Sequence, residues 1–211
     1  MKQIRSFRDF SIRENTKYCN HLIIVDVQKS FRKFFTEMYI NLLQKHCENF
    51  ENVYVIWDNH HEGKNVDKDY LFHESPEIPI SDELYKFPNT KSIIEKRYNY
   101  DVDVKFYKKI LSQEVYQQIT DLENNKNLKR GDFFPTTEGT VIVYIGNHHR
   151  WFHCPKKLYE VLTSLKNEKI QIVGGSDSEC FLDVMTTAQS LGCDITPNHK
   201  FIWSANHCPI K

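Results

Sequence analysis

The sequence lacks an excess of charge of either sign. Its 28 lysine and arginine residues equal its 28 aspartate and glutamate residues, so the formal net charge is zero with neutral histidine. A protein that binds nucleic acid or an anionic membrane surface through electrostatics carries a basic excess. We therefore expect neither partner, and the short basic stretch at 126–130 is too small to change this expectation.

Long apolar runs are also missing. No stretch approaches the roughly 20 residues that a membrane helix needs, and residues 1–15 are charged throughout and lack the apolar core of a signal peptide. The sequence has no low-complexity tract and no internal repeat. With 40% hydrophobic residues it has ample material for a core. These features predict a soluble, cytoplasmic protein that is not processed.

Closely spaced cysteine pairs are absent as well. The six cysteines are Cys19, Cys47, Cys154, Cys180, Cys193 and Cys208. They form no CxxC pair, and without a secretion signal they are expected to be free thiols in a reducing compartment. Most of them should pack in the core, as free cysteines commonly do.

Apolar strands alternate with amphipathic helices along the chain. Residues 21–27 and 52–58 are nearly continuous apolar runs, typical of strands buried on both faces of a parallel sheet. Residues 30–50 between them carry apolar side chains at helical spacing, which makes a right-handed βαβ unit. Further strands are expected at 92–98, 141–146, 170–175 and 201–204, and further helices at 101–122, 155–167 and 179–192.

This alternation predicts an α/β protein, a three-layer α/β/α sandwich with a mostly parallel, Rossmann-like central sheet. A chain of 211 residues is within the range of a single domain, and we expect one domain over 1–211. Long loops are expected at about 59–90, which is irregular, and at about 123–153, which begins with a polar, turn-rich stretch at 123–132 and includes the strand expected at 141–146.

Functional groups in such a sheet lie at the carboxyl ends of the strands. Asp26 closes the first predicted strand and Asp58 the second. An acid embedded in the apolar run at 21–27 is either hydrogen-bonded or functional, because burying an unpaired carboxylate is costly. The alternative is that Asp26 caps the loop into the next helix.

Cys180 follows a strand and a Gly-Gly turn and stands in the first turn of a predicted helix. The unpaired N–H groups and the dipole at a helix start can lower the pKa of a thiol below its usual value of about 8.5. The same N–H groups could hold an oxyanion. An acid beside such a thiol is the pair that covalent catalysis needs, while the alternative is a small residue that packs the helix start.

Two segments resemble the motifs of isochorismatase-like cysteine hydrolases. HLIIVDVQKSF at 21–31 is similar to the first motif, in which an aspartate ends an apolar strand and a phenylalanine follows shortly after. IQIVGGSDSECFLDVMTTAQSLGCDI at 170–195 is similar to the second, in which a strand runs into Gly-x-x-Thr-x-x-Cys and the cysteine opens a helix. The order of elements agrees over roughly 20–205.

The resemblance implies a role for each matching position. Asp26 would be the general base and Cys180 the nucleophile. Backbone N–H groups around Ser176 and Cys180 would form the oxyanion hole, and the bond between Gly175 and Ser176 would be cis. At positions 177 and 178 this chain has aspartate and serine where the family has threonine and aspartate. That departure leaves the substrate open.

The third catalytic residue of the family is a lysine. EKRY at 95–98 resembles the lysine motif and makes Lys96 the candidate. The spacing between Lys96 and Cys180 is longer than in the family, so this reading requires an insertion after Lys96. Aligning by spacing instead places 141–146 opposite the lysine strand, and that segment contains no lysine.

Histidines raise the question of a metal. Nicotinamidases of this superfamily bind a divalent ion through an Asp-x-His after the second strand and a later histidine, a pattern that Asp58, His60 and His73 reproduce. These ligand types suit zinc, but a polar loop can also contain histidines without a metal. In the aromatic and histidine-rich stretch at 148–154, His149 and Trp151 are expected at the rim of the pocket.

Two functions follow from these motifs. The first is a cysteine hydrolase of the nicotinamidase kind, which cleaves an amide or ureido C–N bond of a small molecule through a thioester and requires no cofactor. The alternative is a degenerate, non-catalytic member that binds a ligand or acts as a scaffold, with the catalytic lysine lost. Members of this family often self-associate, so a homo-oligomer is possible in either case.

Overall fold

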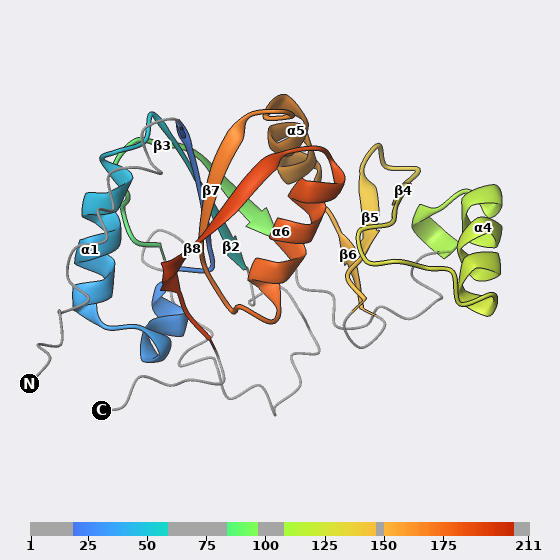
Figure 1. Cartoon of the computed structure of the whole chain (residues 1–211), viewed down its shortest axis with the longest axis horizontal. Helices are drawn as coiled ribbons and strands as arrows, with labels where there is room; N and C mark the ends of the chain where they lie inside the picture. The colour runs from blue at the N-terminus through green and yellow to red at the C-terminus, as the bar shows by residue number, and fades with distance from the viewer. Residues whose placement is uncertain (1–18, 59–83, 97–107, 147–149, 205–211) are drawn as a thin grey trace, which may run out of the picture.

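The computed structural model of the protein describes residues 19–58, 84–96, 108–146 and 150–204. Its centre is a five-stranded parallel sheet with the strand order β3-β2-β1-β7-β8 (Figure 1). The strands are β1 (His21–Val25), β2 (Asn52–Asp58), β3 (Thr90–Lys96), β7 (Lys169–Gly174) and β8 (Asp194–Ile202). The prediction of an α/β protein with a parallel central sheet is confirmed.

Helices cover both faces of this sheet. One face carries the 3₁₀ helix η1 (Lys29–Phe34) and α1 (Glu37–Cys47), and the other carries α5 (Lys156–Ser164) and α6 (Cys180–Ser190) (Figure 1). The single helix expected over 30–50 is therefore divided. Thr36 causes the division, because its hydroxyl accepts a hydrogen bond from the Tyr39 N–H at 3.2 Å and starts α1 as its N-cap.

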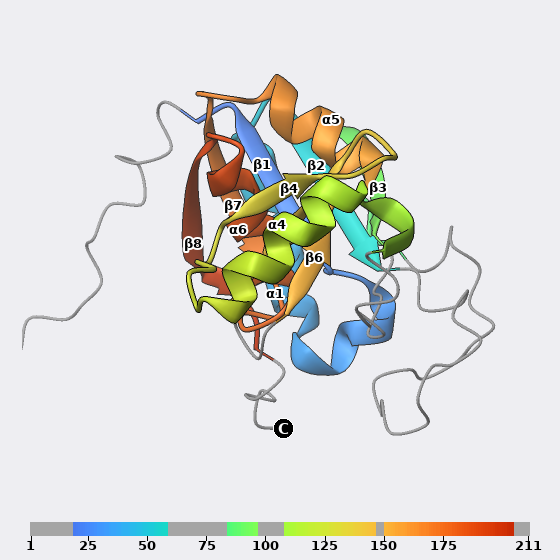
Figure 2. The same ribbon diagram turned by 90° about the vertical axis from the view of Figure 1, so that its right-hand side faces the viewer.

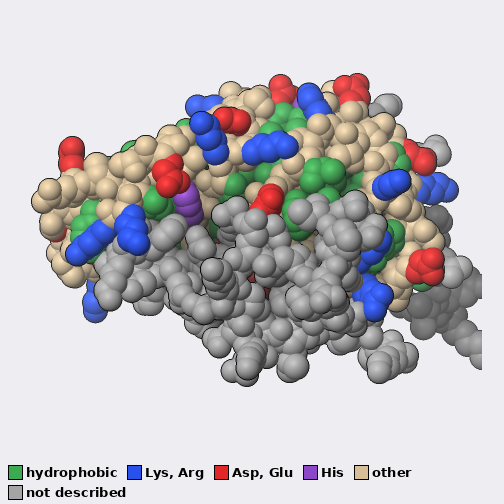
Figure 3. All heavy atoms as spheres, turned by 180° about the vertical axis from the view of Figure 1, so that it is seen from behind, with side chains coloured by type: hydrophobic (Ala, Val, Ile, Leu, Met, Phe, Trp, Pro, Cys, Tyr) green, Lys and Arg blue, Asp and Glu red, His purple; other side chains and the backbone are tan. Residues whose placement is uncertain are grey.

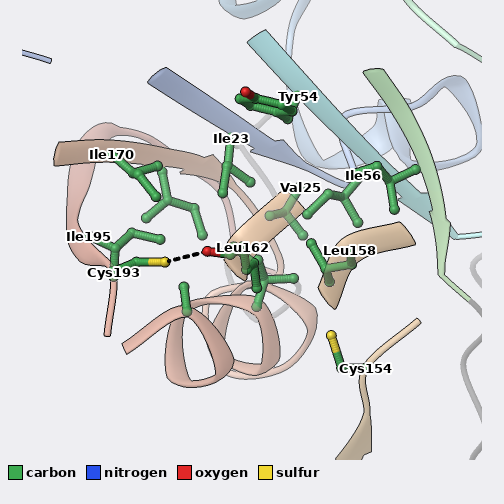
Figure 4. Close-up of a cluster of buried hydrophobic side chains, with 14 of the residues drawn as sticks. Ile23, Val25, Tyr54, Ile56, Cys154, Leu158, Leu162, Ile170, Cys193 and Ile195 are labelled. Carbon is green, nitrogen blue, oxygen red and sulfur yellow. Dashed lines mark hydrogen bonds between the residues drawn. The ribbon is translucent and has the colours of Figure 1, made fainter. Parts of the chain in front are cut away.

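The three inner strands of the central sheet, β1, β2 and β7, are buried on both faces, as their apolar runs predicted. Leu22 and Ile24 of β1 pack in the core on the α1 side, while Ile23 and Val25 pack in the larger core under α5 and α6. This is the alternation with a period of two that a strand imposes. Figure 4 shows the larger core, in which the strand side chains lie against Leu158 and Leu162 of α5.

A second sheet lies outside the central one. It is antiparallel and consists of β4 (Phe133–Pro135), β5 (Val141–Tyr144) and β6 (Trp151–His153). The strand expected at 141–146 therefore exists but does not join the central sheet. The expected loop at 123–153 contains β4 and β6, which are only three residues long and so carry too little periodicity to be recognised.

The small sheet packs between α6 and α4 (Gln113–Asn124) (Figures 1 and 2). Val141 and Val143 belong to the larger core with α5 and α6, whereas Ile142 on the opposite face packs with Ile119 of α4. The described residues therefore add a sheet and a helix to the three layers predicted. As a consequence, α6 is covered on two sides by sheets.

Two further elements differ in their bounds. The helix expected over 101–122 is interrupted: residues 108–110 are helical, and α4 then starts anew because the Ser112 hydroxyl accepts from the Val115 N–H and caps it. Residues 101–107 lie outside the described residues. The last strand, β8, begins at Asp194 rather than near 201. Its polar sequence, including Pro197, suits an edge strand.

The described surface carries charges of both signs. On the face shown in Figure 3, basic and acidic side chains are interspersed with small hydrophobic areas. Within the described ranges, none of the helices combines the length and the apolar character needed to cross a membrane.

Candidate active site

The site begins at the carboxyl ends of two neighbouring strands. Asp58 is the last residue of β2, Lys96 is the last residue of β3, and the two are direct partners in the strand register. Ile56 and Ile94, two positions earlier, both belong to the core under α5 and α6. Because strand side chains alternate with a period of two, Asp58 and Lys96 point to that same face.

Asp26 follows β1 directly, and its N–H donates to the Ile56 carbonyl at 2.9 Å. Its φ angle is +51°, in the left-handed region that residues other than glycine seldom adopt. This conformation breaks the alternation of β1 at Val25 and allows the carboxylate to reach the Lys96 side chain. Strained backbone at the end of a strand is a common feature of functional sites.

Lys96 joins the two carboxylates in one buried ion cluster. Its Nζ lies 2.9 Å from Asp26 Oδ2 and 3.1 Å from Asp58 Oδ2, and no side chain of the three is more than 2% exposed. Burial lowers the pKa of Lys96, but the charges of Asp26 and Asp58 outweigh it and hold the pKa well above its ordinary value. The ammonium group is therefore charged at neutral pH.

Cys180 completes the cluster from the other side. It is the first residue of α6 and is buried, and ligand atoms of Asp26, Asp58 and Cys180 all lie within 4.8 Å of one another. No side-chain cap occupies the start of α6, so its first turn has N–H groups without helical partners. The Phe181 N–H donates to the Ser176 carbonyl at 3.2 Å, so the thiol stands beside a carboxylate and at a helix start whose donors are partly occupied.

Two glycines allow the turn between β7 and α6 to approach β1. Gly174 has a φ of +105°, and a Cβ atom there would lie 1.9 Å from the Val25 carbonyl oxygen. A Cβ atom on Gly175 would lie 2.5 Å from the Trp203 ring. The peptide bond between Gly175 and Ser176, where the family resemblance places a cis bond, is cis. This close approach brings the start of α6 beside Asp26.

The protonation states follow from burial. Burial raises the pKa of Asp26 to about 6, against the opposing charge of Lys96. Burial also raises the pKa of Cys180 well above its ordinary value; Lys96 lowers it, while Asp26, Asp58 and Asp183 raise it further. At neutral pH the resting site therefore pairs a carboxylate with a protonated thiol.

The raised pKa of Cys180 differs from the lowered pKa expected for a cysteine at a helix start. The reason is the relative size of the effects. A helix terminus contributes about 0.3–1 kcal/mol to a neighbouring charge, whereas full burial can shift a pKa by 3–5 units. Burial and three nearby carboxyl groups therefore prevail over the helix dipole.

The predicted metal site is described only in part. Asp58 is present, but its Oδ2 is engaged by Lys96, so only Oδ1 could serve a metal ion. His60 and His73 lie outside the described residues. The cluster of Asp26, Asp58 and Cys180 has the spacing of a ligand set, yet the Lys96 ammonium already supplies a positive charge within it. The described residues do not make a metal site by themselves.

Of the two residues expected at the pocket rim, only Trp151 is described, and its side chain is packed in a core instead. Trp151 is 7% exposed and packs between Phe134 and Tyr144 in the core under α4. Its neighbour Phe152 faces the opposite side of β6, toward α6, so the alternation of the strand turns Trp151 away from Cys180. His149 lies outside the described residues.

Two residues near the site escaped the sequence analysis. Asp183 lies one turn after Cys180 on α6 and is buried, and Arg150 Nη2 lies 2.6 Å from its Oδ1. Asp183 was missed because it lies outside the apolar stripe of α6. It is buried only because the small sheet covers a second face of that helix. An arginine in the aromatic stretch at 148–154 was the one available signal.

Gln28 also has a part in the site. Its Nε2 donates to the Asp58 carbonyl at 3.1 Å, and its Oε1 accepts from the Asp58 N–H at 2.9 Å. This pair of hydrogen bonds fixes the backbone of Asp58 at the end of β2. A buried glutamine two residues after Asp26 could have been singled out, since buried amides need partners.

Comparisons with family models, with curated proteins and with solved structures find no match for this chain. The assignment of function therefore depends on the geometry of the site and on the resemblance of the two motifs.

Proposed function

We propose that this protein is an isochorismatase-like cysteine hydrolase that cleaves an amide or ureido C–N bond of a small molecule through a thioester intermediate. One observation carries the proposal. Asp26, Lys96 and Cys180 come from three distant segments of the sequence and lie in one buried cluster at the strand ends. They are the residues that the motif resemblance selects as base, lysine and nucleophile.

The first half of the reaction forms the thioester. The ionised Asp26 carboxylate accepts the thiol proton as Cys180 Sγ bonds to the substrate carbonyl carbon, and the C=O electron pair moves to oxygen. Backbone N–H groups at Ser176 and at the start of α6 would donate to this oxyanion. When the carbonyl re-forms, the C–N bond breaks and Asp26 delivers its proton to the leaving nitrogen.

The second half restores the enzyme. Asp26, ionised again, removes a proton from water as the water oxygen attacks the thioester carbon. The C–S bond then breaks, the acid product leaves, and the proton returns to sulfur. Because the pKa of Asp26 is about 6, the carboxylate can both accept and release a proton near neutral pH.

Lys96 stabilises this cycle by its fixed charge. Its ammonium contacts Asp26 and opposes the effect of burial on the pKa of both Asp26 and Cys180. The proposed degenerate, ligand-binding member requires that the lysine be absent from the site. The distance of 2.9 Å between Lys96 Nζ and Asp26 Oδ2 therefore favours the hydrolase.

A divalent ion such as zinc, held by Asp58 with His60 and His73, would act as a Lewis acid toward the substrate carbonyl. The steps above do not depend on it.

A generic acyl donor tests the proposal without knowledge of the substrate. The protein is incubated with p-nitrophenyl acetate at pH 7.5, and acetylated peptides are located by mass spectrometry. We expect acetyl on Cys180 of the wild type, and acylation at least about 100-fold slower in Asp26→Asn, the usual loss when a general base is removed. Cys193→Ala is the matched control, because Cys193 is a buried thiol just after the other end of α6.

A panel of primary amides and ureides, with released ammonia as the readout, then identifies the substrate class. Acetyl found equally on Cys180 and Cys193, or ammonia release that survives Cys180→Ala, would contradict the proposal.

A further inference from the structure

The first turn of α6 is held from outside the central sheet. Arg150 stands immediately before β6 of the small sheet, and its Nη2 lies 2.6 Å from Asp183 Oδ1 and 3.1 Å from the Glu179 carbonyl oxygen. Glu179 precedes Cys180 and Asp183 follows it by one turn. The guanidinium group therefore contacts α6 on both sides of the cysteine along the helix.

These contacts are of a strong kind. The bond to Asp183 has a charged guanidinium donor, which makes it shorter and stronger than a hydrogen bond between neutral groups. The side chains of Arg150 and Asp183 are only 18% and 4% exposed, so water screens the pair little. A planar guanidinium can donate to two acceptors at once, which a lysine ammonium on a flexible stem does less well.

Other contacts from the same part of the chain hold α6 farther along. Arg130 donates to Thr186 Oγ1 at 3.0 and 3.3 Å, and the Ser190 hydroxyl donates to the Gly131 carbonyl at 2.8 Å. Thr186 and Ser190 are more than one turn beyond Cys180. Among these contacts, only those of Arg150 are made to the turn of α6 that carries the thiol.

We propose that Arg150 is a positioning residue, which holds the first turn of α6 so that Cys180 Sγ stays within reach of Asp26. The functional part of this inference rests on the proposed function. The small sheet thereby contributes to the active site through Arg150, although its strands lie outside the central sheet. Loss of the two contacts would let the first turn of α6 open and separate the thiol from Asp26.

Charged groups from three parts of the described structure surround the first turn of α6. Glu179 and Asp183 stand on or next to α6, Arg150 comes from the small sheet, and Asp26, Asp58 and Lys96 come from the ends of the central strands. The effect of Asp26→Asn on the titration of Cys180 reports on the contact between Asp26 and the thiol. Comparing this effect with and without Arg150 separates the role of Arg150 from that of the other charged groups.

The first measurement is the pH profile of Cys180 alkylation by iodoacetamide, read by mass spectrometry. It is made in the wild type, Arg150→Met, Arg150→Lys and the matched control Arg130→Met, each with and without Asp26→Asn. In the wild type and in Arg130→Met we expect the same shift of the midpoint on Asp26→Asn. In Arg150→Met we expect Asp26→Asn to shift the midpoint by less than about a third of the wild-type shift, because residues that no longer interact show little coupling. We also expect the midpoint of Cys180 alkylation in Arg150→Met itself to lie near the ordinary thiol value of about 8.5.

The second measurement is hydrogen exchange of the amides at 180–184. We expect exchange at least about tenfold faster in Arg150→Met, as for a turn that opens locally, an intermediate rate in Arg150→Lys and no change in Arg130→Met. Unchanged protection and an undiminished Asp26 effect in Arg150→Met would overturn the proposal. If that variant does not fold, wild-type behaviour of Arg150→Lys in both measurements overturns it instead.

The two measurements separate the two proposals. If Asp26→Asn has no effect on Cys180 in the wild type, the proposed function fails, while hydrogen exchange still decides whether Arg150 holds the turn.

Discussion

Lys96 Nζ lies 2.9 Å from Asp26 Oδ2, although the strands that carry these residues do not pair and β2 runs between them. Strands two positions apart in a sheet are separated by roughly 9–10 Å. The long Lys96 side chain and the Asp26 carboxylate together cover that gap, and between them the ammonium also meets the Asp58 carboxylate at 3.1 Å. A single cation therefore connects the ends of three strands.

Replacing Lys96 by methionine leaves two carboxylates buried without their cation. Breaking a buried ion cluster in this way costs about 3–5 kcal/mol, and we expect the free energy of unfolding at pH 7 to fall by that amount, measured by urea denaturation. Lys157→Met is the control, since the exposed Lys157 donates to the Ile93 carbonyl of β3 and, among the described residues, takes part in no buried ion cluster, so its loss should cost about 1 kcal/mol or less. Equal losses in the two variants would contradict the buried ion cluster.

Asp26 and Lys96 should act on the Cys180 thiol in opposite directions. The Asp26 charge raises the pKa of Cys180 and the Lys96 charge lowers it. Asp26→Asn should therefore move the midpoint of Cys180 alkylation to lower pH by about one unit or more, and Lys96→Met should move it to higher pH. Cys193, followed in the same mass spectra, serves as the internal control. Shifts of the same sign in both variants would count against the described geometry.

The rate of Cys180 acylation should depend on the protonation of Asp26. Since the pKa of Asp26 is about 6, the fraction of ionised base rises through that value. We expect acetylation by p-nitrophenyl acetate to increase between about pH 5 and pH 7 with a midpoint near 6, and we expect this limb to disappear in Asp26→Asn. If the rise in the acylation rate between pH 5 and pH 7 is also seen in Asp26→Asn, it is caused by a group other than Asp26.

Gly174 should not tolerate a side chain. Its φ of +105° opposes alanine, and so does the Val25 carbonyl oxygen, which would lie 1.9 Å from the Cβ atom of an alanine there. Gly174→Ala is therefore expected to give little folded protein by circular dichroism. Gly139→Ala separates the two causes, because Gly139 has a φ of +76° but a Cβ atom there would have no described atom within 4 Å. It should lose only about 1–2 kcal/mol, the cost of the left-handed conformation. Similar losses at both positions would argue against the close contact of β7 with β1.

Asp183 should make stability depend on pH. Burial raises its pKa to about 7, more than Arg150 lowers it, so between the unfolded value near 4 and pH 7 the folded protein binds the proton more tightly. Its contribution to stability is present below pH 4 and is lost as the pH rises through 7. Between pH 4 and pH 7 we expect the free energy of unfolding to fall in the wild type by a few kcal/mol more than in Asp183→Asn. This difference corresponds to on the order of 1 kcal/mol for each unit by which the pKa is raised. Parallel curves for the two proteins would show that Asp183 titrates normally.

Local patterns along the sequence account for much of the fold. The apolar runs at 21–27, 52–58 and 170–175 correspond to β1, β2 and β7, because a parallel strand covered on both faces must be apolar throughout. The edge strand β8 was recognised only at its end, since a strand with one neighbour can be polar. The small sheet was not foreseen, because β4 and β6 are only three residues long and so carry too little periodicity to be recognised.

The site shows the same division between local pattern and long-range packing. Asp26 and Cys180 could be singled out from the sequence because each stands at the boundary between a strand and the next element, where polar groups of a parallel sheet collect. Lys96 was one of two alternatives, and only the register of β2 and β3 places it between the carboxylates. Asp183 was missed because it lies outside the apolar stripe of α6, and the position of Arg150 in an aromatic stretch does not reveal that the two side chains meet.

By itself, the sequence determined which segments are strands and helices and which strand ends carry an acid or a thiol, because these properties depend on neighbours a few residues away. The tertiary structure decided the rest. It decided that three strand ends share one ammonium group, that burial rather than the helix dipole sets the pKa of Cys180, and that a second sheet covers α6. These outcomes depend on distances between residues far apart in the chain, and on the solvent that packing excludes, and no local pattern encodes either.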